Sequence, residues 1–212
     1  MPEVSAHPRF ARKYVRISEA SDRRGSAAHR ERMLAGLSGR VIEVGAGNGR
    51  NFAHYPSTVV EVVAVEPDPY LRGHAERAAA RASVPIRVVD GDAEHLPAED
   101  AEFDAAVFSL VLCSVPDVDS ALTEAWRVLR PGGEARFYEH VRDENLLLGG
   151  IQDLITPLWK RLGGGCHPNR DTETALRRAG FAVDSERFAF RPMAWLPPSA
   201  HILGTASKPE GR

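Results

Sequence analysis

An apolar stretch that changes abruptly into glycines is the feature that most constrains the fold of this chain. Residues 41–51 run Val-Ile-Glu-Val-Gly-Ala-Gly-Asn-Gly-Arg-Asn, so glycine stands at 45, 47 and 49. Glycine adopts positive φ without strain and lets the backbone pass close beneath a ligand. The pattern predicts a buried strand, then a loop that cradles a nucleotide-like ligand, then the start of a helix.

Short apolar runs alternate with longer amphipathic ones from residue 40 to about 140. This alternation is typical of successive βαβ units, and it predicts a Rossmann-like α/β fold: a doubly wound, mostly parallel seven-stranded sheet with helices on both faces. The expected strands are 40–44, 59–65, 86–90, 103–109, 135–140, 182–190 and 201–206. The expected helices are 70–82, 119–129, about 146–162 and 171–179, with a sharp stop at 131–133.

The length of 212 residues fits one α/β domain, expected over residues 38–207. A charged, helix-prone head, residues 1–37, precedes this domain and is a candidate lid, although a surface helix fits equally well. Residues 208–212 form a short polar tail.

Charge and cysteine content exclude several classes of protein. Lysine and arginine number 27 against 29 aspartate and glutamate, so no net field favours nucleic acid. Basic residues interrupt the first thirty positions, and we expect neither a signal peptide nor a membrane anchor there. Cys113 and Cys166 lie far apart and outside any Cys-x-x-Cys pair, which predicts no disulfide framework, no metal site and a reducing, cytoplasmic location.

Carboxylates follow the second and third expected strands, at the sheet edge where open α/β folds bind ligands. Glu66 can accept hydrogen bonds from both hydroxyls of a ribose, although an isolated glutamate at a strand end is usually only solvated. For Asp92, an equally good interpretation is an ordinary aspartate that stabilises a turn. Arg50 occupies the position of the third glycine of a dinucleotide fingerprint, which disfavours a nicotinamide dinucleotide.

The glycine loop, Glu66, Asp92, the strand at 103–109 and the run at 127–133 together resemble class I S-adenosylmethionine-dependent methyltransferases in order and spacing. The resemblance implies S-adenosylmethionine as the cofactor, S-adenosylhomocysteine as its product, and no metal. It places Asp92 on the adenine amino group and Ser109 and Leu110 at the methionine end. The implied donor-binding residues are Glu43, Gly45, Ala46, Gly47, Asn48, Asn51, Glu66, Pro67, Asp92, Ala93, Ser109 and Leu110.

The second half of the chain resembles a narrower group, the methyltransferase-like alkyl-thiol S-methyltransferases. The similarity covers about residues 38–207 and implies a small-molecule acceptor, with a thiol as the first hypothesis. The chain departs from that group in having Glu66 where the group has aspartate and in lacking the group's hydrophobic N-terminal anchor. The segments that carry the resemblance are 110–115, 127–133, 139–141, 157–160, 163–166, 170–173, 195–197 and 201–204.

Methyl transfer is an in-line displacement, and a thiol needs little activation because its thiolate is already a strong nucleophile. His140, at the end of the fifth strand, is the candidate general base, with a purely structural histidine as the equal alternative. The candidate acceptor-site residues are Tyr14, Cys113, Trp159, Cys166, His167 and Trp195. The alternatives are that the two cysteines are buried and inert, and that the aromatic residues only pack in the core. Asp171 could face the acceptor or be the N-cap of the helix that begins there. An O-, N- or C-methyltransferase and a non-catalytic donor-binding module also stay open, and the oligomeric state is not predicted.

Overall fold

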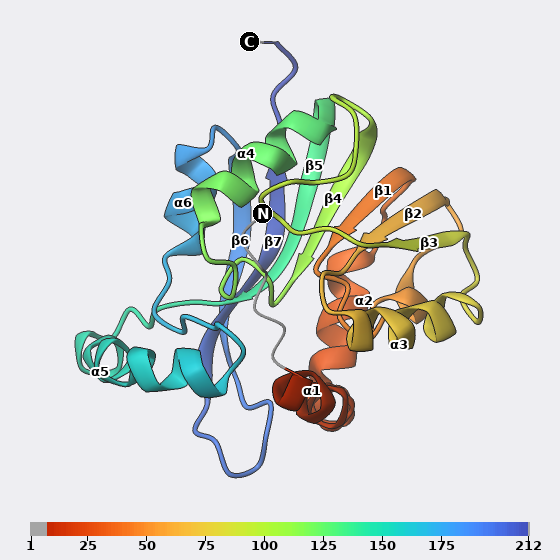
Figure 1. Ribbon diagram of the computed structural model, residues 1–212. Coiled ribbons are helices and arrows are strands. Elements are labelled where there is room, and N and C mark those ends of the chain that lie inside the picture. The colour runs from red at the N-terminus through yellow and green to blue at the C-terminus, as the bar shows by residue number, and fades with distance from the viewer. Residues whose placement is uncertain (1–7, 212) are drawn as a thin grey trace.

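The structure is a computed structural model that describes residues 8–211 (Figure 1). Seven strands form one sheet in the order β3-β2-β1-β4-β5-β7-β6. Only β7 runs antiparallel to its neighbours, which confirms the predicted doubly wound, mostly parallel sheet. The strands are β1 Gly39–Val44, β2 Val59–Val65, β3 Ile86–Val89, β4 Phe103–Ser109, β5 Leu129–His140, β6 Ala182–Phe190 and β7 Ser199–Ser207.

Helices cover both faces of the sheet because the central strands are apolar on both sides. Ile42 and Val44 pack with α4 and α6, whereas Val41 packs with α2 and α3 on the opposite face. Figure 1 shows α4 and α6 together on one side. The helices are α1 Pro8–Ser21, α2 Ala27–Leu34, α3 Pro69–Ala79, α4 Val118–Val128, α5 Leu146–Leu162 and α6 Thr172–Arg178, with a π-helical turn at Asp22–Ser26 and a 3-10 turn at Phe52–His54.

The expected helix after the glycine loop is wrong. A 3-10 turn over Phe52–His54 takes its place, and Tyr55 then adopts an extended conformation with ψ of 128°. Tyr55 precedes Pro56, and a residue before proline is disfavoured in the helical region. The chain therefore leaves the loop directly towards β2.

The expected start of the fifth strand at residue 135 is also wrong, because β5 begins at Leu129. Pro131 and the two glycines after it end α4 as expected, but they continue within the sheet rather than in a separate turn. The Gly132 N–H donates to the Lys208 carbonyl across 3.0 Å, and the Lys208 N–H donates to the Gly133 carbonyl across 2.8 Å. The end of β7 thus supplies backbone partners for the glycine stretch.

Helix α5 carries many apolar side chains that are not covered by the rest of the chain. Leu146 and Leu154 are more than four-fifths exposed, at 83% and 81%. Among residues 8–211, no helix combines the length and the apolarity needed to cross a bilayer.

Candidate donor and acceptor site

The glycine loop follows β1 and folds back against the end of β2. Gly45 and Gly47 have φ of 68° and 57°, which favours glycine at both positions. A Cβ at Gly45 would lie 2.7 Å from the Val111 side chain, and one at Gly47 would lie 3.1 Å from the Tyr14 ring. The backbone here is in close contact with two other segments, so larger residues would displace them.

Glu66 connects the end of β2 to this loop. Its side chain is only 5% exposed, and it accepts hydrogen bonds from the Gly47 N–H at 2.7 Å and the Asp68 N–H at 2.9 Å. Burial raises the pKa of this carboxyl group. Each carboxylate oxygen has a second lone pair, so the group retains acceptor capacity for hydroxyls of a ligand.

Glu43 lies beneath the glycine loop and is 2% exposed. Its two oxygens accept hydrogen bonds from the Asn51 amide at 2.9 Å and from the Tyr55 hydroxyl at 2.6 Å. Burial is the main cause that raises the pKa of Glu43 to about 7. Both oxygens thus accept hydrogen bonds from protein groups, and Glu43 supports the loop from below.

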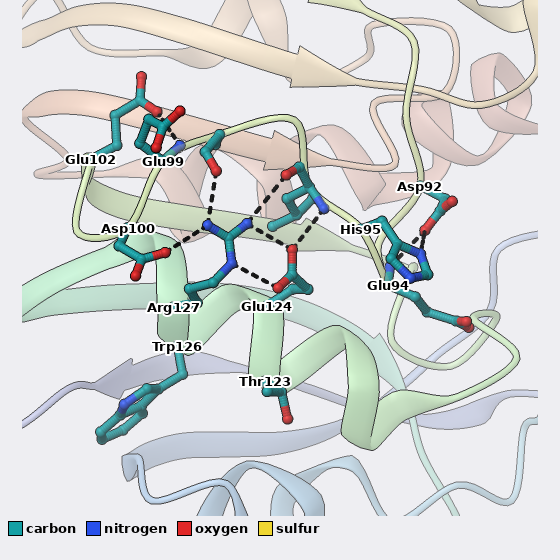
Figure 2. A network of polar contacts seen from close by, with 12 residues as sticks. Asp92, Glu94, His95, Glu99, Asp100, Glu102, Thr123, Glu124, Trp126 and Arg127 are labelled. Carbon is teal, nitrogen blue, oxygen red and sulfur yellow. Dashed lines mark hydrogen bonds and ion pairs between the residues drawn. The ribbon is translucent and has the colours of Figure 1, made fainter.

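Asp92 lies in the loop after β3, which is fastened to α4 (Figure 2). Its Oδ1 accepts from the Glu94 N–H at 2.8 Å, the turn geometry that the sequence left open. Arg127 of α4 donates to Asp100 at 2.9 Å and to the Ala98 carbonyl at 2.8 Å, and these contacts hold the loop in place. Pro67 and Ala93 directly follow Glu66 and Asp92 in their loops.

The end of β4 meets the N-terminal head through Arg30, a residue that sequence reasoning missed. Arg30 is 4% exposed and donates to Ser109 Oγ at 2.6 Å and Asn51 Oδ1 at 2.9 Å. Its Nε lies 3.2 Å from Asp22. Arg30 stands in a run of charged residues that resembles a solvated helix face, so no local pattern distinguishes it. Leu110, which follows Ser109, has φ of 62°, a strained conformation that clusters at functional sites.

The head lies over the glycine loop. The ring of Tyr14 packs on Gly47, and Ser18 Oγ donates to Asn48 Oδ1 at 3.2 Å. Two of the residues named from the sequence, Tyr14 and Gly47, therefore meet, although they lie on opposite sides of the expected domain boundary. Ala46 is buried next to them in the same loop.

Cys113, His140 and Cys166 form a compact group beyond the ends of β4 and β5. The two thiols share a hydrogen bond across 3.9 Å, and Cys166 Sγ lies 3.6 Å from His140 Nδ1. The shared hydrogen bond raises the pKa of Cys113 and lowers that of Cys166. Burial lowers the pKa of His140 to about 4, so its imidazole is neutral near pH 7 and is a weak general base.

The other expected acceptor residues lie outside this group. His167 Nδ1 lies 3.3 Å from Arg170, which in turn donates to the Leu112 and Val115 carbonyls. Trp195 is 72% exposed in the loop between β6 and β7. The indole of Trp159 lies against Gly163, just before Cys166. Asp171 caps α6 by accepting from the Thr174 N–H at 3.1 Å, which confirms the N-cap interpretation.

Residues 42–137 match the family model described as a methyltransferase domain. Over 183 residues the chain is 35% identical to thiol S-methyltransferase TMT1B of Rattus norvegicus, a match that covers 82% of this chain and 74% of the relative. The chain belongs to this methyltransferase family. S-Adenosylmethionine is therefore its cofactor, and the resemblance stated from the sequence is confirmed.

This methyltransferase is also similar to two other known proteins. It is 31% identical over 191 residues to a demethylmenaquinone methyltransferase of Deinococcus radiodurans, covering 88% of this chain and 79% of the relative. A solved structure from Thermotoga maritima, described as a SAM-dependent methyltransferase and possible histamine N-methyltransferase, aligns with a TM-score of 0.70. That alignment covers 94% of this chain and 97% of the other at 23% identity, and so it shows the shared fold.

Proposed function

We propose that this methyltransferase transfers the methyl group of S-adenosylmethionine to the sulfur of a small, apolar thiol. The observation that carries the proposal is the 35% identity to TMT1B across 82% of the chain. Methyltransferases of many specificities share the cofactor half of the chain. A match of this extent also includes residues outside that half.

The acceptor side of the site is consistent with a nucleophile that needs little help. The one candidate base, His140, has a pKa of about 4, far below the value that suits proton abstraction at neutral pH. A thiol is a far stronger acid than an alcohol, and its thiolate is a strong nucleophile. The enzyme then mainly has to align the two reactants and exclude water.

In this proposal the thiolate sulfur attacks the methyl carbon in line with the donor sulfonium. A new carbon–sulfur bond forms, the old one breaks, and its electron pair remains on the donor sulfur to give S-adenosylhomocysteine. Glu66 and Asp92 hold the ribose and the adenine, and Ser109 and Leu110 lie at the methionine end. The head, through Tyr14 and Ser18, covers the donor as a lid.

A second function, methylation of an aromatic ring carbon, is supported by the identity to the demethylmenaquinone methyltransferase. Incubation of the purified protein with S-adenosylmethionine and a panel of alkyl thiols, quinols, phenols and amines separates the two. Products are identified by mass spectrometry as a gain of one methyl group. Methylation of the thiols alone supports the proposal. Methylation of the quinols without methylation of the thiols would instead support methyl transfer to carbon.

A further inference from the structure

The group formed by Cys113, His140 and Cys166 is unusual because three separate segments place two thiols and an imidazole together, the two cysteines being 53 positions apart. One ligand-type atom from each residue lies within 4.8 Å of the other two. The two cysteines lie far apart along the chain, and for this reason the sequence predicted no metal site. The fold removes that separation, since their sulfurs lie 3.9 Å apart.

Backbone contacts fix the position of Cys113. The buried carboxylate of Glu139 accepts hydrogen bonds from the N–H groups of Val111, Leu112 and Cys113, at 2.9, 2.9 and 3.0 Å. The Cys113 carbonyl also accepts from the His167 N–H at 2.7 Å. The loop that carries this thiol is therefore held from two sides.

Cys166 reaches the group because three glycines precede it. Gly165 has φ of 92°, and a Cβ there would lie 2.9 Å from the Ser114 carbonyl oxygen. A Cβ on Gly164 would overlap the ring of Phe10 at 2.3 Å. Only this close passage between α1 and the loop after β4 places the Cys166 thiol over Cys113.

His140 is oriented from behind. Its Nε2 lies 2.9 Å from Ser199 Oγ at the start of β7. With the proton on Nε2, the Nδ1 lone pair points to the sulfur of Cys166, 3.6 Å away. A histidine that binds a metal usually donates its other N–H to such a partner, which fixes both tautomer and ring orientation.

The spacing fits one tetrahedral ion. Zn²⁺ bonds of about 2.3 Å to sulfur and about 2.0–2.1 Å to nitrogen put neighbouring tetrahedral ligands about 3.8 Å apart for two sulfurs and about 3.6 Å apart for sulfur and nitrogen. The distances here are 3.9 Å and 3.6 Å. We infer that Cys113, Cys166 and His140 form a three-ligand site for a soft divalent cation, Zn²⁺, whose fourth position takes the sulfur of the acceptor thiol.

Three protein ligands with one open position are typical of catalytic rather than structural zinc. A hollow lined by Pro157, Lys160, Arg161 and Gly165 includes the residue directly before Cys166. The buried indole N–H of Trp159 contributes to the lowered pKa of the Cys166 thiol, so it lies beside that sulfur. This fourth-ligand step rests on the proposed function.

The step balances without an added oxidant or reductant. The acceptor thiol releases a proton to solvent when its sulfur binds the metal. A sulfur lone pair then forms the bond to the methyl carbon, and the electron pair of the broken bond stays on the donor sulfur. The neutral thioether is a weaker ligand and dissociates.

The metal site is tested on the full chain purified in the presence of a phosphine reductant. Metal content is measured after Zn²⁺ loading and gel filtration for the wild type and for Cys113→Ser, Cys166→Ser, His140→Gln and His54→Gln. We expect about one Zn²⁺ per chain in the wild type and His54→Gln, and at least a tenfold loss in the other three. No stoichiometric metal in the wild type, or binding unchanged in the three variants, would overturn the inference.

Substitution of Co²⁺ gives a readout that needs no variant to fold. The wild type should show the visible bands of tetrahedral cobalt together with thiolate charge-transfer absorption, and an alkyl thiol should intensify the latter. A Cys113–Cys166 disulfide that persists in the presence of the phosphine reductant, or absorption typical of octahedral cobalt, contradicts the site. Thiol methylation that continues after the metal is chelated would reject the metal site but support the proposed function. The cobalt absorption without methylated thiol products would support the metal site but reject the proposed function.

Discussion

Arg30 of α2 donates a hydrogen bond to Ser109 at the end of β4 across 2.6 Å, although the two residues lie 79 positions apart. The same guanidinium group contacts Asn51 in the turn after the glycine loop and Asp22 in the head. The head is therefore joined to both sides of the donor site by one buried cation.

The change Arg30→Met is expected to lower the free energy of unfolding by about 3 kcal/mol, because it leaves polar partners buried. The loss stays at the low end of the range for buried pairs, since Asp22 keeps Arg50 at 2.5 Å. Arg32→Met, on the same helix, is the control: Arg32 pairs with Glu186 at about half exposure, and the cost is at most about 1 kcal/mol. Urea unfolding measures both, and equal losses would refute the role of Arg30.

Glu66→Gln is expected to weaken S-adenosylmethionine binding by about 1.5–3 kcal/mol, or about 10- to 150-fold in Kd. The substitution removes the negative charge. It also places the new side-chain amide N–H₂ against the N–H group of Gly47 or Asp68, and two donors cannot form a hydrogen bond with each other. Glu61→Gln, in the strand that Glu66 follows but partly exposed and paired with Arg40, is the control. Calorimetry with donor and product reports the difference, and an unchanged Kd in Glu66→Gln contradicts the ribose role.

Glu43 makes stability depend on pH. Its pKa is raised to about 7 in the folded protein by burial, against 4.5 for the ordinary group. Arg30, Asn51 and Tyr55 act in the opposite direction, and Glu66 adds to the rise. The folded state thus holds this proton to higher pH than the unfolded state, so the stabilising contribution is complete below about pH 4.5 and is lost as pH rises through about 7.

Glu43→Gln, which mimics the protonated form, is therefore expected to be close to the wild type in stability at pH 5. At pH 9 it should be more stable than the wild type by roughly 1–3 kcal/mol. Thermal or urea unfolding at the two pH values gives the comparison. A variant that is destabilised equally at both would show that Glu43 is ionised throughout.

Gly165→Ala is expected to destabilise the protein by about 1–3 kcal/mol, because φ of 92° is strained for alanine and the new Cβ meets the Ser114 carbonyl. Gly150→Ala is a control of opposite sign. Gly150 lies inside α5 with nothing within 4 Å of its Cβ position, so alanine there should stabilise by about 0.4–1 kcal/mol. Equal effects of the two changes would mean that the loop before Cys166 is not tightly packed.

The sequence predicted those parts of the fold in which local pattern and burial agree. The strands β2, β4 and β6 have the expected bounds, because the first two are interior strands with one charged residue each and the third alternates at the edge of the sheet. The glycine loop was also predictable, but not the packing of Gly49, whose Cβ would lie 2.8 Å from Ala78 of α3. That close approach makes the glycine at 49 necessary while Arg50 is tolerated beside it.

Long-range contacts between ordinary-looking residues were not predictable. Arg30 is buried only because Ser109, Asn51 and Asp22 surround it, and these residues come from separate elements. The two cysteines meet because Glu139 holds one loop and the glycines before Cys166 allow the other to approach. Neither fact has a periodicity or a spacing that could be detected along the chain.

The central claim is that the acceptor atom is sulfur, and competition among matched acceptors tests it most directly. An alkyl thiol, the alcohol and the amine of the same chain length, and a quinol are offered together with donor carrying a trideuterated methyl group. Mass spectrometry then gives the relative kcat/KM for each acceptor. The account predicts label on the thiol with at least a hundredfold preference over the other acceptors, and label that enters the quinol or the amine while the thiol stays unlabelled would contradict it.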